Sequence, residues 1–107
     1  MRFQILSDLH LEFFSSRDSK IEFLESLKTD ADYVLLAGDI STGKNIVQDY
    51  NLVGDVLGNI IYIAGNHEYY HSSKFYIDGL LQHDVEGIFL NDNYVIIDDV
   101  AIVGGTG

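Results

Sequence analysis

The chain has 107 residues, enough for one small domain, and 47% of them are hydrophobic while 21% are charged, a balance typical of a globular protein. It contains no cysteine, which excludes disulfides, thiolate metal sites and cysteine nucleophiles. Seventeen acidic against six basic residues leave a net charge of −11, which opposes phosphate-rich partners unless bound cations reverse the local field.

The first third of the chain predicts two strands with a helix between them. Residues 3–6 form a short apolar run, and residues 33–37 form a longer one without polar alternation, which is typical of a strand buried on both faces. Residues 19–22 (SKIE) have the form of a capping box, and apolar residues follow at helical spacing. We therefore expect an amphipathic helix over residues 20–28 that covers a sheet.

The same alternation of helix and strand continues through the middle of the chain. Apolar residues at helical spacing predict a second helix over residues 43–53, and the apolar run that follows predicts a third strand over residues 60–64. A third helix is expected over residues 73–82 and a fourth strand over residues 87–90. This order indicates an α/β domain with a mainly parallel sheet flanked by helices.

The C-terminal part of the chain predicts a β-hairpin. Turn residues at 91–93 and 98–99 separate two short apolar runs, residues 94–97 and 100–103. No repeat or linker is visible, and the chain contains no proline, so we expect residues 1–107 to form a single domain.

Each of the three apolar strands ends in groups that bind metal ions in other proteins. Asp8 and His10 follow the first strand and Asp39 follows the second. Asn66 and His67 follow the third. Ligands of α/β sheets bind beyond the carboxyl ends of the strands, so we expect these side chains to meet at one edge. Carboxylate, imidazole and amide donors together suit Mn, Fe, Zn or Ni better than an all-oxygen calcium site.

Taken singly, each residue has a simpler interpretation. Asp8 or Asp39 could cap a turn, and Asn66 could occupy a left-handed turn position after Gly65. Either histidine could be an ordinary surface side chain. Repetition at three successive strand ends favours a metal site, and two metal ions about 3.5 to 4 Å apart are suited to phosphoryl transfer. Gly38 and Gly65 would allow the close backbone approach that such a site needs.

Three stretches resemble the motifs of the calcineurin-like metallophosphoesterase superfamily: SDLHLE at 7–12, AGDI at 37–40 and GNHEYY at 65–70. The resemblance covers nearly the whole chain and implies the N-terminal half of an α/β/β/α sandwich. The segment after Asp39 lacks the Asp-Arg-Gly of the protein-phosphatase branch. The chain is therefore more similar to the bacterial and phage phosphoesterases and phosphodiesterases.

The resemblance also implies a function and a set of site residues. The function is hydrolysis of a phosphomonoester or phosphodiester by two divalent metal ions, with manganese among the candidates. The substrate is a phosphate ester, and nucleic acid enters only as a possible substrate. By resemblance, Asp8 and His10 bind the first metal and Asn66 binds the second, while Asp39 bridges both. His67 contacts the scissile phosphate as general acid or transition-state donor.

The family's second half supplies a lone histidine and a Gly-His-x-His motif that have no counterpart here. After His67 the remaining histidines are His71 and His83. The second metal therefore keeps only Asp39 and Asn66 from this chain, and we expect its site to be incompletely liganded. We also expect one face of the sheet to expose apolar residues that need a partner.

Three explanations for the missing half stay open. The chain is a truncated part of a longer enzyme, it associates with itself or with a complementing C-terminal half, or it is a catalytically inactive assembly or protein-interaction module. A nucleotide-binding module is disfavoured, since residues 38–44 lack the glycine spacing of a phosphate loop. No apolar run approaches the roughly 20 residues of a membrane span, so we expect a cytoplasmic protein without membrane partners.

Residues next to the motifs have their own expected roles. His71 could replace a missing ligand of the second metal, although the simpler interpretation is a solvated side chain. Glu12 and Glu68 are expected to orient or cap rather than to ligate, and His83 to favour a helix C-terminus. The two tyrosines at 69–70 are expected to be wall or core residues.

Overall fold

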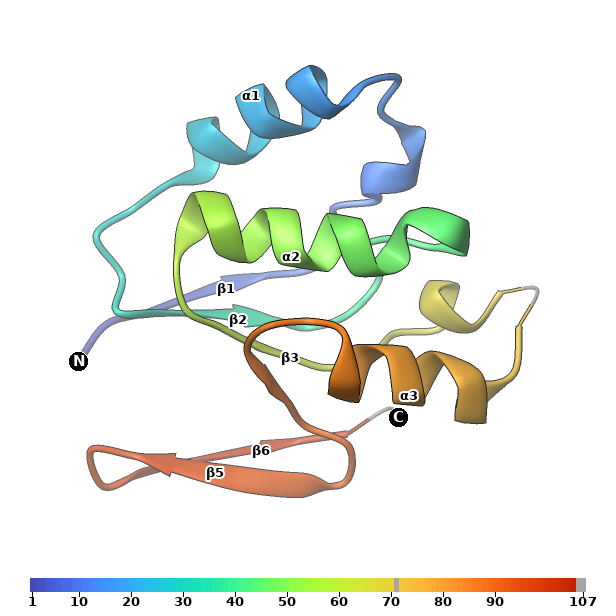
Figure 1. Ribbon diagram of the computed structural model, residues 1–107. Coiled ribbons are helices and arrows are strands. Elements are labelled where there is room, and N and C mark those ends of the chain that lie inside the picture. The colour runs from blue at the N-terminus through green and yellow to red at the C-terminus, as the bar shows by residue number, and fades with distance from the viewer. Residues whose placement is uncertain (71, 106–107) are drawn as a thin grey trace.

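The computed structural model describes residues 1–70 and 72–105 and confirms the α/β fold class. Every predicted helix and strand is present (Figure 1). No helix in the described part of the chain is long and apolar enough to cross a membrane. The strands and helices are β1 (Phe3–Leu6), α1 (Arg17–Leu27), β2 (Tyr33–Leu36), α2 (Ile46–Leu57), β3 (Ile60–Tyr62), α3 (Lys74–His83), β4 (Ile88–Phe89), β5 (Asn93–Ile97) and β6 (Val100–Gly104), with 3₁₀ turns η1 (Leu11–Phe13), η2 (Gly43–Asn45) and η3 (His67–Tyr69).

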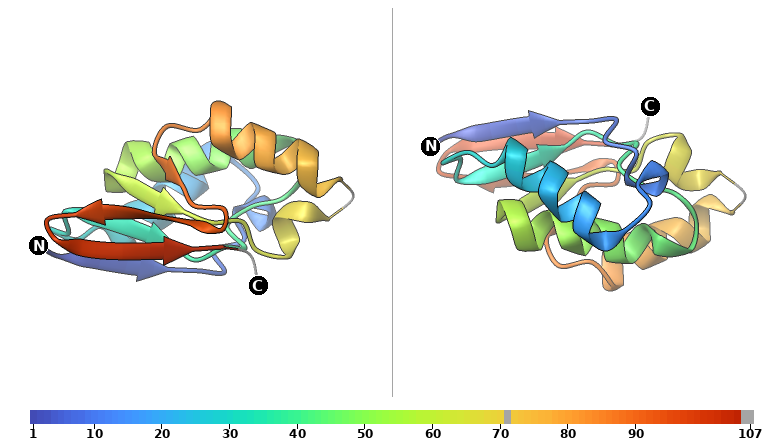
Figure 2. Two further views of the ribbon diagram at one scale, coloured as in Figure 1. Left: turned by 90° about the horizontal axis from the view of Figure 1, so that it is seen from below. Right: turned by 90° about the horizontal axis from the view of Figure 1, so that it is seen from above.

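The main sheet has four parallel strands in the order β1-β2-β3-β4. Each strand pairs with the next one along the chain, and crossovers between parallel strands are right-handed, so all three helices cover the same face. Figure 1 shows α1, α2 and α3 on this face. Figure 2 shows the antiparallel hairpin β5-β6 against the opposite face. This arrangement agrees with the predicted half of a sandwich.

The core lies between the sheet and the helices. Tyr62 is 1% exposed, and its ring packs 5.4 Å from the ring of Tyr50 and 5.5 Å from that of Phe89, centroid to centroid. Its hydroxyl donates to the carbonyl oxygen of Leu81 at 2.6 Å, which ties β3 to α3. Burial raises the pKa of Tyr62 to about 12, so this hydroxyl stays protonated and available as a donor.

Helix α1 begins at Arg17, so the predicted start at residue 20 is wrong. The cap is Ser16, whose hydroxyl accepts from the backbone N–H of Ser19 at 3.1 Å. The side chain of Ser19 accepts in return from the backbone N–H of Ser16 at 3.3 Å, which completes a capping box one turn earlier. As a consequence, Lys20 lies inside the helix and is buried.

The other element ends differ from the predicted ones by a few residues. Helix α2 continues four residues past the predicted end at 53, because Gly54 lies inside the helix and Gly58 is the cap. Strand β3 ends at Tyr62 rather than at the predicted residue 64. After Tyr62 the chain leads to the loop of the candidate site.

The hairpin leaves much apolar surface in solvent, as the sequence predicted for one face. Tyr94 is 64% exposed, Ile96 62% and Val103 78%. Ile5 on the outer strand β1 is 70% exposed. A hollow of about 250 Å³ lies between sheet and hairpin, lined by residues of both, including Ile5, Leu35 and Ile102. The hairpin therefore covers this face only in part.

Candidate metal centre

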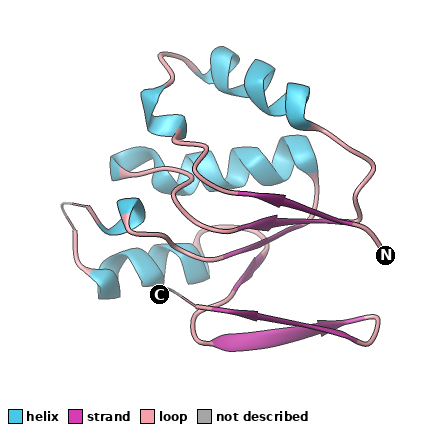
Figure 3. Ribbon diagram, turned by 180° about the vertical axis from the view of Figure 1, so that it is seen from behind, coloured by secondary structure: helices cyan, strands magenta, loops and turns pink. Residues whose placement is uncertain are grey.

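The loops that follow β1 and β2 stay paired beyond the ends of the strands. The backbone N–H of Asp8 donates to the carbonyl oxygen of Gly38 at 3.0 Å, and that of His10 donates to the carbonyl oxygen of Asp39 at 3.2 Å. Leu11 continues the series with a bond to Ile40 at 2.8 Å. Figure 3 shows the carboxyl ends of β1, β2 and β3 on one side of the sheet. The predicted meeting of the strand ends is therefore observed.

Three of the candidate ligands have left-handed backbone conformations. The φ angles are 56° for Asp8, 48° for His10 and 57° for Asp39. This region is uncommon for residues other than glycine, and such outliers concentrate at functional sites. The inter-loop hydrogen bonds hold these three residues in place, so their positions are fixed by the backbone.

Two glycines let the loops after β2 and β3 approach closely. A Cβ atom on Gly65 would lie 2.3 Å from Oδ1 of Asp39, and one on Gly38 would lie 2.8 Å from the backbone nitrogen of Gly65. Gly38 also has a φ of 96°, which L side chains rarely adopt. Asn66 is exposed at the start of η3 with a φ of −61°, so its left-handed interpretation is wrong.

The His10 side chain lies between two carboxylates. Its Nδ1 is 3.0 Å from Oε2 of Glu12, and its Nε2 is 3.8 Å from Oδ1 of Asp8. The hydrogen bond to Glu12 raises the pKa of His10 above its usual value, although partial burial opposes the shift. A carboxylate on one ring nitrogen is the common way to orient a metal-ligating histidine, so Glu12 orients His10 and leaves Nε2 toward Asp8.

Asp39 and His67 form the second contact of the centre. Oδ1 of Asp39 accepts from the backbone N–H of His67 at 2.9 Å and lies 3.3 Å from Nδ1 of its ring. Burial raises the pKa of Asp39, but the hydrogen bond and the imidazole of His67 outweigh it and lower the pKa overall. The rings of His10 and His67 meet edge to face, with centroids 4.7 Å apart.

Glu68 joins the loops after β2 and β3. It is fully buried, and its carboxylate accepts from three backbone N–H groups, those of Gly65 at 2.5 Å, Asp39 at 2.8 Å and Ser41 at 3.0 Å. Burial raises the pKa of Glu68, and the three hydrogen bonds oppose that shift. These contacts agree with the predicted capping role, since Glu68 binds backbone rather than facing the ligands.

A buried ion pair extends this network to the helices. Nζ of Lys20 on α1 is 2.7 Å from Oδ1 of Asp49 on α2, and Asp49 accepts from the hydroxyl of Ser41 through its other oxygen at 2.5 Å. Lys20 is 9% and Asp49 2% exposed. The sequence interpretation missed this pair. The available signal was an aspartate within the apolar stripe of α2.

Two aromatic side chains flank the histidines. The ring of Phe13 stacks on His10 with centroids 5.5 Å apart and planes at 23°. The ring of Tyr70 lies 4.6 Å from His67. Phe13 is 79% and Tyr70 52% exposed. Tyr69 instead packs against the core, and its hydroxyl donates to Asp78 at 2.6 Å. The wall or core interpretation therefore fits Tyr69, whereas Tyr70 is a partly exposed neighbour of His67.

The donors fit a divalent metal in chemical type but do not form a closed site. Asp8 and Asp39 supply carboxylates and His10 an imidazole, a set suited to borderline cations. Nδ1 of His67 is buried and has no hydrogen-bond partner among the described residues. Among residues 1–70 and 72–105, no group of three His, Cys, Asp or Glu side chains is close enough to hold a metal.

The remaining histidines add no described ligand. His71, the possible substitute ligand, lies outside the described residues. His83 is exposed in the last turn of α3, which is the position predicted for it.

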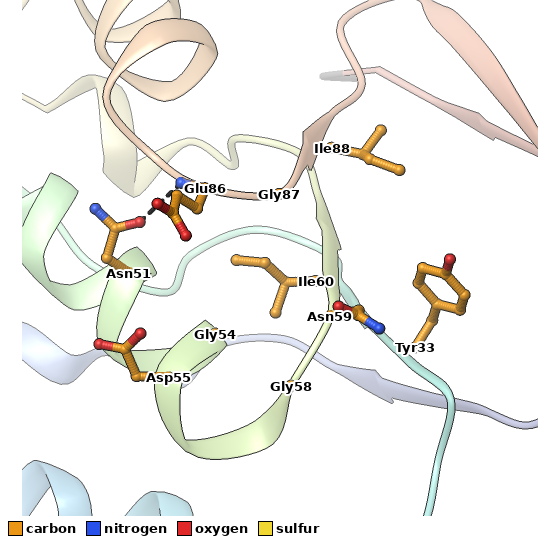
Figure 4. Close-up of a pocket in the computed structure, with 10 residues that line it drawn as sticks. All are labelled: Tyr33, Asn51, Gly54, Asp55, Gly58, Asn59, Ile60, Glu86, Gly87 and Ile88. Atoms are coloured by element: carbon orange, nitrogen blue, oxygen red, sulfur yellow. Dashed lines mark hydrogen bonds between the residues drawn. The ribbon is translucent and has the colours of Figure 1, made fainter.

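A larger cavity lies at the opposite end of the sheet. Its volume is about 410 Å³, and Figure 4 shows Asp55 of α2, Asn59 before β3 and Glu86 before β4 in its lining. Asn51 accepts from the backbone N–H of Glu86 at 2.8 Å (Figure 4). Its lining contains no histidine and none of the strand-end residues, so the cavity is separate from the candidate centre.

Comparisons with known proteins point to one family. A model of the calcineurin-like phosphoesterase family matches residues 1–106, which include every candidate ligand. An uncharacterized protein of Acanthamoeba polyphaga mimivirus is 30% identical over 117 residues, which covers 94% of this chain. The chain spans 42% of the length of that relative. No solved structure matches the chain.

Proposed function

Because the chain belongs to the calcineurin-like phosphoesterase family, we propose that it serves in metal-dependent hydrolysis of a phosphate ester at the carboxyl edge of its sheet. The main support is the backbone pairing that holds three left-handed residues, Asp8, His10 and Asp39, on adjacent loops. Asp92, Asp98 and Asp99 are also left-handed, in the turns before and within the hairpin, so the conformation by itself does not mark a site. The support comes from the hydrogen bonds that hold Asp8 and His10 beside the loop of Asp39, at the edge where two strands end.

In this proposal the chain contributes three ligands of a first metal ion and two of a second, and neither set is closed by the described residues alone. Asp8, His10 and Asp39 hold the first ion, while Asp39 and Asn66 contribute to the second. When bound, such ions supply positive charge to the phosphate oxygens and lower the pKa of a water molecule. The missing ligands of the second ion come from a continuation of the chain or from a complementing polypeptide.

The protein groups have distinct tasks in the same proposal. His67 faces the phosphate and acts as general acid or as a hydrogen-bond donor to the transition state. Its side chain is 35% exposed, so substrate can reach it, and the backbone bond to Asp39 fixes its position. Glu12 keeps His10 in one orientation. Bound metal ions would also offset the repulsion between a chain of net charge −11 and a negatively charged phosphate ester.

Manganese binding tests the proposal directly. Asp39→Asn removes the charge but keeps an oxygen for the His67 bond and tolerates the left-handed backbone. We expect it to weaken Mn²⁺ binding at least about tenfold in calorimetry, because a bridging carboxylate is lost. Asp55→Asn, at the opposite end of the sheet, is the matched control and should bind Mn²⁺ like the wild type.

Hydrolysis is the second readout. Manganese should stimulate cleavage of bis(4-nitrophenyl) phosphate once a complementing half is present, and Asp39→Asn should abolish it. Equal Mn²⁺ affinity in Asp39→Asn and wild type, or a complemented assembly without any turnover, would contradict the proposed function.

A second candidate function is an inactive assembly or protein-interaction module. The exposed apolar surface of the hairpin favours it, since Tyr94, Ile96 and Val103 are all more than half exposed. Sedimentation velocity distinguishes the two. Self-association without Mn²⁺ binding would support the module, whereas Mn²⁺ binding by a monomer would count against it.

A further inference from the structure

Phe13 and Tyr70 each contact one of the two site histidines through the same backbone geometry, a 3₁₀ turn. Each lies three residues after its histidine and closes a 3₁₀ turn, with the N–H of Phe13 bonded to the carbonyl oxygen of His10 and that of Tyr70 to His67, both at 3.1 Å. Side chains three residues apart eclipse in this geometry, so each aromatic ring is carried onto its histidine. Two separate loops thus build the same pair.

The two pairs form one continuous row of four rings. Phe13 contacts His10 at 5.5 Å, His10 contacts His67 at 4.7 Å, and His67 contacts Tyr70 at 4.6 Å, all between centroids. The inner members are the candidate ligand and the candidate phosphate-binding group. The outer members, Phe13 and Tyr70, are 79% and 52% exposed.

The exposed ring of Phe13 is held in place beside the site, unlike that of Phe75. One face of its ring lies against His10, and the side chain is still 79% exposed, which leaves the other face to solvent. Phe75 on α3 is also exposed, at 92%, but makes no ring contact with any described residue. Phe13 differs because its position is fixed beside the site.

We propose that Phe13 and Tyr70 bind a planar aromatic group of the phosphate ester, of the size of one nucleobase; this rests on the function proposed above. Stacking on aromatic side chains is the general way to hold a base without sequence readout. The net charge of −11 disfavours a long polyanion, so a mononucleotide-sized ester fits better than a nucleic acid strand.

Ligand affinities in saturating Mn²⁺ test this inference by calorimetry. Adenosine 5′-monophosphate carries a base and a phosphate, whereas glycerol 3-phosphate carries only the phosphate. We expect the wild type to bind the nucleotide about tenfold more tightly, the low end of what one stacked base contributes. Phe13→Leu and Tyr70→Leu keep an apolar side chain but remove the ring, so each should reduce this preference and leave glycerol 3-phosphate affinity unchanged.

Phe75→Leu is the matched control and should keep the full preference. Equal affinity of the wild type for the two compounds would overturn the inference while leaving the proposed function intact, because phosphate would still bind. The same holds if both leucine variants retain the preference. Failure of both compounds to bind in Mn²⁺ would contradict the proposed function and this inference together.

Discussion

The two faces of the main sheet are closed in different ways. On the helix side, buried tyrosines pack against β3, and the Lys20–Asp49 pair, Ser41 and Glu68 connect the helices to the loops of the candidate centre. On the other side, the hairpin leaves Tyr94 and Val103 largely in solvent above a hollow of about 250 Å³. The helix side is therefore closed by buried contacts, whereas the hairpin side leaves apolar surface uncovered.

The comparison also separates two kinds of polar group. On the helix side the buried carboxylates are hydrogen-bonded: Glu68 accepts from backbone N–H groups, and Asp49 binds Lys20 and Ser41. At the candidate site, in contrast, Asp8 and Asn66 are exposed. Buried polar groups are costly unless they are hydrogen-bonded, so the network must be fully formed for the loops to hold their shape. Stability of the helix side and ligand geometry are therefore coupled.

The largest effect is expected from breaking the buried ion pair. Lys20→Met leaves Asp49 buried without its cation and should lower the free energy of unfolding by about 3 to 5 kcal/mol in urea denaturation. The double variant Lys20→Met/Asp49→Leu should recover most of that loss, because an apolar pair replaces the uncompensated charge. Lys74→Met, which breaks an exposed pair with Asp78, is the control and should have no measurable effect.

Glu68→Gln should have the next largest effect. Glu68 uses both carboxylate oxygens to accept from three backbone N–H groups. A glutamine replaces one of these oxygens by an NH₂ donor, so at least one backbone N–H loses its acceptor. We expect a loss of about 1 to 3 kcal/mol in the free energy of unfolding, and weaker Mn²⁺ binding since the loops of Asp39 and Gly65 lose their connection. An unchanged urea midpoint would show that the hydrogen bonds of Glu68 contribute nothing to stability.

Substitutions on the outer face of the hairpin should hardly affect folding. Tyr94→Thr and Val103→Thr replace exposed apolar groups, so each should change the free energy of unfolding by less than about 0.5 kcal/mol. If this surface receives a partner, the same variants should reduce association in sedimentation velocity. A loss of stability as large as that of Glu68→Gln would mean that the hairpin surface contributes to folding as much as the buried contacts of the helix side.

The smallest effect is a change of titration at His10. Glu12 raises the pKa of His10 in the folded chain, so this contribution to stability is present at low pH and is lost as pH rises through the raised pKa. Glu12→Gln should lower that pKa, measured from the imidazole proton shifts of the metal-free chain by NMR. Because a metal needs the neutral ring, the variant should also keep Mn²⁺ to a lower pH than the wild type.

Much of the fold, and the place where the candidate ligands lie, follows from local patterns. Apolar runs without alternation predicted β2 and β3, and the polar groups after them predicted where Asp8, Asp39 and His67 meet, since parallel strands end at one edge. The start of α1 was predicted wrongly because two serines three residues apart both satisfy the sequence form of a cap, and only the backbone geometry selects Ser16.

The tertiary structure decided which side chains from separate elements touch. A sequence shows that Lys20 and Asp49 are charged, but their pairing depends on how α1 packs beside α2, and a lone charge at either place would be unfavourable. The same holds for the three donors to Glu68 and for the row of rings from Phe13 to Tyr70. Periodicity and strand-end chemistry are local properties, whereas these contacts exist only after the sheet has brought distant loops within hydrogen-bonding distance.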